Sequence, residues 1–129
     1  MSFLAKIEID GALHNVLDCT FRFHQPVSEN NKPDGSVKGG QIDVTIELSQ
    51  HLDLLDWMVQ PLMTKDGQVI FYKRDALSKQ IALQFKEAFC TQLTGNYDGV
   101  SEEPLKVSFT ISAKELRINE SVEYLNIWN

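Results

Sequence analysis

The sequence lacks the marks of a membrane-spanning, disulfide-rich or nucleic-acid-binding chain. No apolar run reaches the ~18 positions that a membrane-spanning helix needs. Only two cysteines, Cys19 and Cys90, occur in 129 residues, and no Cys-x-x-Cys pair indicates a zinc or thioredoxin-like site. The net charge of −6 argues against nucleic acid as a partner, because phosphate binding needs clustered Lys and Arg.

The N-terminal stretch also lacks the pattern of a secretory signal peptide, because charges already occur at Lys6 and Glu8. We therefore expect folding and assembly in the cytoplasm, and any secretion by a route without a cleaved signal. The length predicts a single domain over residues 1–129. The two cysteines are interpreted as small buried thiols, because a cytosolic chain with its own core seldom needs a disulfide.

Catalytic motifs are absent as well. No metalloprotease, lipase or phosphate-loop motif occurs, and His14, His24 and His51 lack the sequence context of a catalytic triad. Acidic pairs such as Asp43 and Glu47 are frequent, but 18 acidic residues among 129 produce such pairs by chance. The sequence predicts no enzyme, no catalytic residue, no metal site and no cofactor.

Strict alternation of apolar and polar residues dominates what the sequence does contain. A period of two is typical of a strand with one buried face. The clearest examples are residues 41–49, with Asp43, Thr45 and Glu47 on the polar face, and residues 105–114, with Ser108, Thr110 and Ser112 on the polar face. Further strands are predicted at 3–9, 16–25, 68–73, 81–93 and 120–128, and a phase shift near Ala88 indicates a bulge.

Several expectations concern particular residues of these elements. In the strand at 16–25, the alternation makes one apolar face of Leu17, Cys19, Phe21 and Phe23. Asp10-Gly11 and Asp66-Gly67 are read as turns.

One helix is predicted over residues 52–60, ending at Pro61. Its apolar stripe consists of Leu52, Leu55, Val59 and Leu62, which recur at spacings of three and four. Trp57 on this helix and Trp128 near the end of the chain are interpreted as core or subunit contacts rather than as a carbohydrate platform.

A long polar connector lies between the second and third strands, over residues 26–40. It contains two prolines, three glycines, two asparagines and four charged residues. Loops of this length are uncommon in a small domain and are usually functional or disordered. Together the patterns predict a mainly β fold: an antiparallel β-barrel with one short flanking α-helix and a long protruding arm between the second and third strands.

Several segments, in this order, resemble the Hcp (TssD) family of type VI secretion tube proteins in its Bacteroidetes form. They include Asn15-Val16-Leu17-Asp18, Gln25-Pro26, Lys32-Pro33, Gly39-Gly40, Asp53-Leu54-Leu55 with Trp57-Met58, Phe71-Tyr72-Lys73-Arg74-Asp75, Ile111-Ser112-Ala113 and Trp128. The resemblance covers nearly the whole chain and contains no catalytic motif. It implies an Hcp-like barrel that assembles with further copies of itself. Phage tail tube proteins are related to this family.

The resemblance implies a structural subunit of the secretion tube. Hexameric rings would stack into a tube, carry effector cargo in the lumen and be expelled when the sheath contracts. The partners would be further copies, the sheath, spike and baseplate proteins, and cargo, without nucleic acid or membrane insertion.

The resemblance also suggests roles for two sets of residues. A ring-stacking arm would comprise Glu29, Asn30, Lys32, Pro33, Asp34, Lys38, Gly39 and Gly40. A lumen or polar sheet face would comprise Asp43, Thr45, Glu47, Ser108, Thr110 and Ser112.

Three alternatives remain at this point. A small-molecule-binding barrel would need a large apolar interior and would be stable as a monomer. A hydrolase would depend on a carboxylate pair. A phage-tail-tube-like protein would share the fold of the secretion tube.

Overall fold

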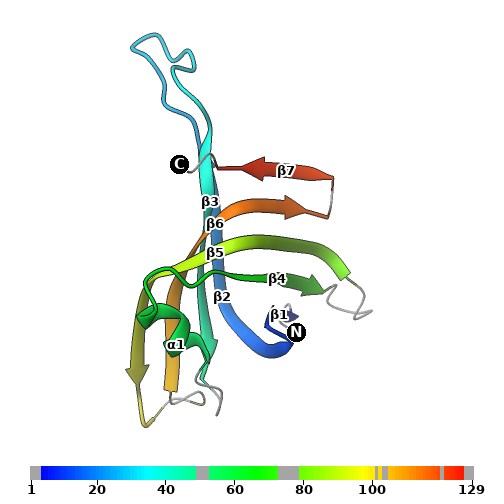
Figure 1. The fold of residues 1–129 in the computed structure, drawn as a ribbon, viewed down its shortest axis with the longest axis vertical. Helices are drawn as coiled ribbons and strands as arrows, with labels where there is room; N and C mark the ends of the chain where they lie inside the picture. The colour runs from blue at the N-terminus through cyan, green and yellow to red at the C-terminus, as the bar shows by residue number, and fades with distance from the viewer. Residues whose placement is uncertain are drawn as a thin grey trace.

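The computed structural model describes residues 4–48, 53–72, 79–100, 102, 105–119 and 121–126. Figure 1 shows its elements in chain order: β1 (Leu4–Ile9), β2 (Ala12–His24), β3 (Lys38–Glu47), α1 (Asp53–Val59), β4 (Lys65–Tyr72), β5 (Lys79–Tyr97), β6 (Leu105–Ile118) and β7 (Val122–Leu125). Among these residues no helix is long and apolar enough to cross a membrane.

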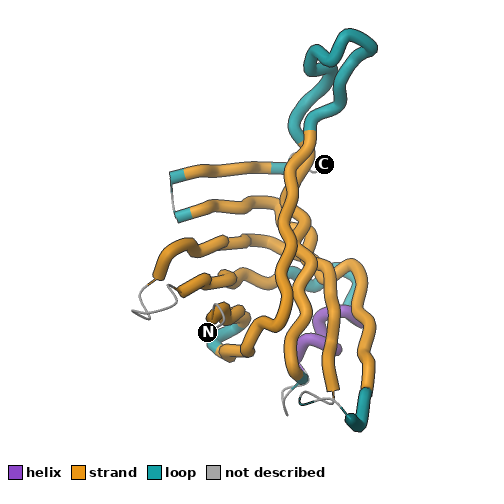
Figure 2. The backbone as a smooth tube through the Cα atoms, turned by 180° about the vertical axis from the view of Figure 1, so that it is seen from behind, coloured by secondary structure: helices purple, strands orange, loops and turns teal. Residues whose placement is uncertain are grey.

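The strands form one antiparallel sheet that closes on itself. The order is β3-β2-β1-β4-β5-β6-β7, and a further pairing of β3 with β6 completes a six-stranded barrel to which β7 is added. The arm leaves between β2 and β3, at the end of the molecule opposite α1 (Figure 2). The predicted barrel, flanking helix and protruding arm are confirmed.

Figure 1 shows that the barrel has two layers whose strands cross steeply. The upright sheet consists of residues 16–24 of β2, β3, residues 105–112 of β6 and residues 89–97 of β5. The crossing sheet contains β1, β4, the first half of β5, the end of β6 and β7. Because β5 and β6 run through both layers, they join the two sheets covalently.

The change of direction in β5 occurs at a bulge. Buried positions change phase between Phe85 and Ala88, and Glu87 adopts a left-handed φ of 49°. Its backbone N–H donates to Asp66 Oδ1 at 2.8 Å. This bond replaces the inter-strand hydrogen bond that the N–H loses at the bulge. The bulge predicted near Ala88 is confirmed.

The core fills the space between the two sheets. Ile42, Val44 and Ile46 of β3 are at most 2% exposed, as the alternation of residues 41–49 predicts. They pack in one cluster with apolar residues of the crossing sheet and with two side chains of α1, namely Ile7, Ile9, Val69, Leu83, Phe85, Leu116, Leu54 and Trp57. Trp57 donates its indole N–H to Met63 O and Ala88 O, both at 3.1 Å, so its interpretation as a core residue is confirmed.

The buried face of the helix is not the one that the sequence suggested. Leu55, Val59 and Leu62 are 37%, 72% and 86% exposed, whereas Leu54 and Trp57 are buried. A helix of seven residues is too short for its spacing to show which of two apolar stripes is buried. The stripe that contains the large Trp57 side chain packs against the core. Leu52, the first residue of the predicted stripe, lies outside the described residues.

The apolar face predicted for residues 16–25 is also largely uncovered. Leu17, Phe21 and Phe23 are 41%, 38% and 37% exposed, and within this set Cys19 packs against the core. Leu17 and Phe23 fall at the two register shifts of β2 against β3, where the alternation is interrupted. For Phe21 the reason is the path of β1, whose pairing with β2 runs only from Ala12 to Asn15. Beyond that point, no described strand other than β3 pairs with β2.

Of the two predicted turns, one is confirmed and one is wrong. Asp10 and Gly11 have φ values of 52° and 80° in the tight turn between β1 and β2. Gly67, in contrast, lies inside β4 and pairs with Phe85. A Cβ at Gly67 would come within 2.7 Å of the Phe85 ring, so this glycine is needed for packing rather than for a turn.

Candidate assembly surfaces

The outward face of the upright sheet is polar over several strands. Asp43 lies opposite Thr110, and Thr45 lies opposite Ser108. Thr110 Oγ1 donates to Asp43 Oδ1 at 2.7 Å, and the hydroxyls of Thr45 and Ser108 are 2.9 Å apart. The register thus brings together residues that the sequence placed on two separate polar faces.

Two further strands extend this face, which the sequence reasoning did not assemble. Arg22 of β2 forms an ion pair with Asp43 at 3.3 Å. The face is hollowed by about 240 Å³ where these strands meet. The lining includes Asp18, Gln92 and Thr94 as well as four of the six predicted residues, namely Asp43, Thr45, Ser108 and Thr110. The alternation of each strand was visible in the sequence, but the pairing of β6 with β3 and β5 was not. Glu47 and Ser112 lie at the two ends of the β3–β6 register.

The upright sheet has two open edges. Residues 16–24 of β2 pair with β3 on one side, and residues 89–97 of β5 pair with β6 on one side. Within the described chain, no strand pairs with the outer side of either stretch. A sheet edge of this kind can be extended by the backbone hydrogen bonds of a strand from a second copy.

The arm is a folded hairpin rather than a featureless loop. The N–H of Asp34 donates to Pro26 O at 2.7 Å, and the N–H of Ser28 donates to Lys32 O at 2.8 Å. Asn31 adopts a left-handed φ of 65° at the tip, which asparagine tolerates well. Because these bonds lie within the arm, it can keep one shape while its side chains stay exposed.

The predicted arm residues fall into two groups. Glu29, Asn30, Lys32, Pro33 and Asp34 lie in the hairpin, where all five are exposed. Lys38, Gly39 and Gly40 belong to β3, so the strand begins three residues earlier than the sequence suggested. The arm proper comprises residues 25–37.

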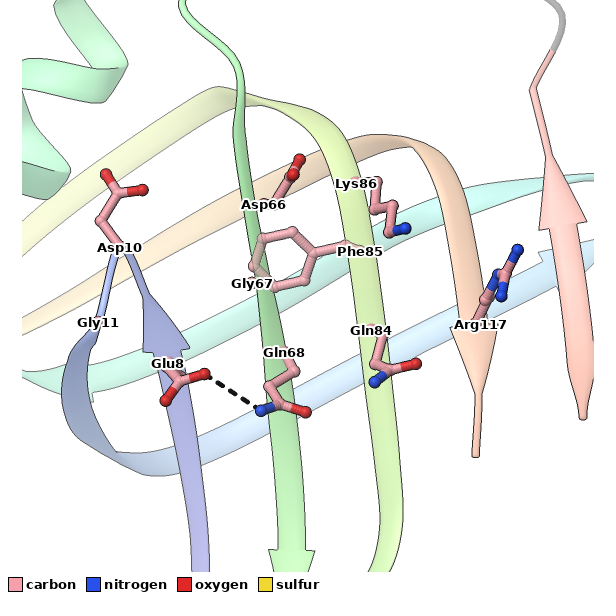
Figure 3. Close-up of a pocket in the computed structure, with 10 residues that line it drawn as sticks. All are labelled: Glu8, Asp10, Gly11, Asp66, Gly67, Gln68, Gln84, Phe85, Lys86 and Arg117. Atoms are coloured by element: carbon pink, nitrogen blue, oxygen red, sulfur yellow. Dashed lines mark hydrogen bonds between the residues drawn. The ribbon is translucent and has the colours of Figure 1, made fainter. Parts of the chain in front are cut away.

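A polar hollow of about 400 Å³ lies on the outer side of the crossing sheet (Figure 3). Glu8, Gln68, Gln84, Lys86 and Arg117 line it together with the two Asp-Gly pairs. Its acids have partners already: Gln68 donates to Glu8 at 3.1 Å, and Asp10 pairs with Lys65. The hollow is therefore lined by polar side chains that bond to one another or to their neighbours, and no group of side chains that could hold a metal ion occurs among the described residues.

The surroundings of both thiols favour the protonated form. Both cysteines are free, as predicted. Burial, with the neighbouring charges of Asp18 and Asp43 adding to it, raises the pKa of Cys19 to about 11. Burial also raises the pKa of Cys90, whose thiol donates to Gln92 O. A raised pKa keeps a thiol protonated and therefore a poor nucleophile at neutral pH.

These surfaces define a class of protein: a packed antiparallel barrel with open sheet edges and a projecting arm. Comparison with known proteins agrees with that class. The sequence model of the family described as hemolysin coregulated protein Hcp (TssD) matches residues 1–129. None of the curated proteins compared with the chain matches it.

Three solved structures illustrate the similarity. Hcp1 from Flavobacterium johnsoniae is 31% identical, with a TM-score of 0.90 over 96% of this chain and 100% of that chain. Hcp1 from Salmonella typhimurium is 11% identical, with a TM-score of 0.76 over 92% of this chain and 86% of that chain. The sheath/tube terminator of an extracellular contractile injection system is 12% identical, with a TM-score of 0.57 over 88% and 91%. The last two show likeness of fold alone.

The chain belongs to the Hcp (TssD) family of type VI secretion tube proteins. The resemblance inferred from the sequence is thereby confirmed, and the similarity to the Flavobacterium protein supports the Bacteroidetes link.

Proposed function

We propose that this chain is the structural subunit of a type VI secretion inner tube. Copies form a hexameric ring, rings stack through their arms, and the lumen carries effector cargo. Sheath contraction then expels the tube together with its cargo. The observation that carries this proposal is the pair of open edges on opposite sides of the upright sheet, in residues 16–24 and 89–97.

The two edges belong to different strands, so joining one copy to the next is a heterologous contact. Such contacts make a closed ring when the rotation between copies closes. In that ring, the upright sheets would form one continuous wall. Its polar side, with Asp43, Thr45, Ser108 and Thr110, would face the lumen, while the crossing sheets would lie outside.

Uncovered apolar side chains lie beside both edges. Phe21 of β2 is on the same face of the sheet as Ile42, its partner across the pair. Helix α1 packs near β5, and its Leu55 and Val59 remain exposed. Joining the β5 edge of one copy to the β2 edge of the next would bring the helix toward Phe21. Burying these groups stabilises the ring by roughly 25 cal/mol for each Å² of apolar surface removed from water.

Negative-stain electron microscopy and light scattering test the ring. We expect rings with a central hole from the wild type, and monomers from Phe21→Arg or Leu55→Arg. Val122→Arg is the matched control, because Val122 is 56% exposed but lies on β7, away from both edges. Rings that survive both edge variants would refute this interface, and a monomeric wild type at high concentration would refute the ring.

The arm is proposed to make the contact between rings. Its support is the projection beyond the barrel and the exposure of Glu29, Lys32 and Asp34 (Figure 2). Deletion of residues 30–37 should leave rings intact and abolish tubes. Tubes that still form from the deletion variant would rule out this role.

The polar face is proposed to hold cargo, with Asp43 and Glu47 as its acidic members. Asp43 is held in place by Thr110 and Arg22, so its charge has a fixed position in the wall. Reversing both charges should reduce the recovery of effectors in a pull-down from the producing cell. Unchanged recovery would remove these two residues from cargo binding.

The remaining partners follow from the tube role: sheath, spike and baseplate proteins of the same machine. Assembly in the cytoplasm followed by expulsion predicts that the protein appears in the medium only when the sheath is functional. Its appearance in the medium without a sheath would contradict this route.

A small-molecule-binding barrel is the second candidate. It is less well supported, because Ile42, Phe85 and Trp57 fill the barrel interior and the hollow in Figure 3 is polar. A clean monomer would favour this candidate. A phage-tail-tube-like role shares the fold and is separated from the secretion tube by the neighbouring sheath and baseplate genes.

A further inference from the structure

The hydroxyl of Tyr124 lies at the root of the arm. It accepts a hydrogen bond from the N–H of Gly39 at 3.1 Å. Its own proton has two acceptors within reach, Val37 O at 3.0 Å and Asn126 Oδ1 at 2.8 Å. One side chain of β7 is thereby bonded to Val37 at the end of the arm and to Gly39 at the start of β3, 87 and 85 residues away in sequence.

Asn126 completes the attachment from the same strand end. Its Nδ2 donates to Gly39 O at 3.2 Å and to Ala113 O at 2.8 Å, so both of its amide protons are used. Gly40 has a left-handed φ of 86°, and a Cβ there would lie 2.7 Å from Ala113 O and from Asn126 Nδ2. The chain therefore needs glycine at this position for two reasons, conformation and space.

The outgoing leg of the arm is held as well. The ring of Phe23 in β2 packs edge-to-face on Tyr124, with centroids 5.3 Å apart and an interplanar angle of 67°. A Cβ at Gly39 would lie 2.2 Å from the Phe23 ring, so the absence of a side chain at Gly39 makes room for that ring. The strand that leads into the arm and the strand that leads out of it thus both contact Tyr124.

We propose that β7 is a clamp that sets the direction of the arm, with Tyr124 and Asn126 as positioning residues for ring stacking. This inference rests on the proposed function. The hairpin keeps its internal shape through its own hydrogen bonds, but none of the described side chains between residues 25 and 37 is buried. Its direction must therefore be fixed at the root. A preoriented arm loses less conformational entropy on docking, which strengthens association without any new contact.

The first test uses the isolated protein. Tyr124→Phe removes the hydroxyl and keeps the ring that packs on Phe23. Hydrogen exchange resolved to single residues should show the Gly39 amide exchanging about 2- to 10-fold faster, the factor expected from one lost hydrogen bond. The amides of Ser28, Asn31 and Asp34, whose bonds lie within the arm, should be unchanged.

Tyr97→Phe is the matched control, because Tyr97 is 71% exposed on β5 and far from the arm. It should leave Gly39 exchange as in the wild type. Adding Asn126→Ala to Tyr124→Phe should increase the effect, since it also removes the bonds to Gly39 O and Ala113 O. Gly39 exchange that stays unchanged in the double variant would overturn the clamp.

The second test measures stacking. Tyr124→Phe should retain rings in electron micrographs while raising the protein concentration needed for tubes by about the same 2- to 10-fold. Faster Gly39 exchange with unaltered stacking would overturn the positioning role. Wild-type rings that never stack would refute the stacking part of the proposed function, and with it any positioning for stacking. The exchange test would still show whether the clamp holds the arm.

Discussion

The barrel and the arm of this protein keep their shapes by different interactions. In the barrel, Ile7, Ile42 and Phe85 are wholly buried in one apolar cluster. In the arm, none of the described side chains from Gln25 to Val37 is buried, and short-range backbone hydrogen bonds hold the hairpin. The barrel is therefore stabilised by burial and is sensitive to changes of volume. The arm is stabilised locally, so changes there should have little effect on global unfolding.

The largest effect is expected from a truncation in the core. Phe85→Ala removes a ring that is fully buried and packs over Gly67. We expect the free energy of unfolding to fall by about 3–5 kcal/mol, from lost burial and the cavity left behind. Urea unfolding measures this change. Leu62→Ala, at a position that is 86% exposed, is the control and should have less than a tenth of the effect.

The next largest effect should come from the joint between barrel and arm. Gly40→Ala forces an L residue into a left-handed φ and places Cβ against Ala113 O. The conformational cost alone is about 1–2 kcal/mol, and the close approach adds to it. Gly95→Ala is the matched control, because nothing lies within 4 Å of a Cβ built there. Equal thermal stability of the two variants would contradict the geometry of the joint.

Thiol chemistry offers a third contrast between the two regions. With a pKa of about 11, Cys19 holds about a hundredfold less thiolate at pH 8 than a thiol at 9.0. A more basic thiolate is intrinsically more reactive, which offsets part of the lower thiolate population. Alkylation of Cys19 should still be at least about tenfold slower than that of an exposed thiol. Ser36→Cys supplies the exposed thiol in the arm for comparison, and mass spectrometry reads each rate.

The same pKa makes stability depend on pH. The unfolded chain loses the Cys19 proton near its ordinary value of 9.0, whereas the folded chain keeps it until about 11. The contribution is fully present below the unfolded pKa and is lost as pH rises toward about 11. Cys19→Ala should remove this part of the pH dependence of urea unfolding. The same dependence in Cys19→Ala would show that Cys19 is not its source.

The smallest effect should be seen in the arm itself. Ser28→Ala removes an Oγ that bonds to Lys32 O and pairs with Asn30. Global unfolding should change by less than about 0.5 kcal/mol, as is usual at surface positions. Exchange of the Asn31 amide should nevertheless accelerate, because the turn around it loses support. A large loss of global stability would show that the arm is coupled to the core after all.

The sequence predicted elements better than it predicted which faces are covered. Alternation located β3 and β6 well, because Ile42 and Val107 are buried on the same side as every second neighbour. Periodicity wrongly predicted that Phe21 and Leu55 are buried. The exposure of Phe21 depends on how far β1 pairs along β2, and that of Leu55 depends on which apolar stripe of the short helix faces the core. Which apolar faces are covered depends on contacts between segments far apart in the sequence, and local alternation does not show these contacts.

The arm root illustrates the same limit. Gly39-Gly40 stood out in the sequence, but nothing connected it with Tyr124 and Asn126, more than 80 residues later. Both residues look like ordinary members of a short edge strand. Trp128 lies outside the described residues, so its interpretation as a core or subunit contact remains a prediction.

The orientation of the upright sheet has a mechanical consequence. Its strands run lengthwise toward the arm (Figure 1), and the hydrogen bonds between antiparallel strands are perpendicular to the strands. A thrust along the arm enters β2 and β3 together and passes to β6 as shear along the β3–β6 register, so the hydrogen bonds of that register must fail together instead of one after another. The strand direction of the upright sheet thus suits a subunit that carries an axial load.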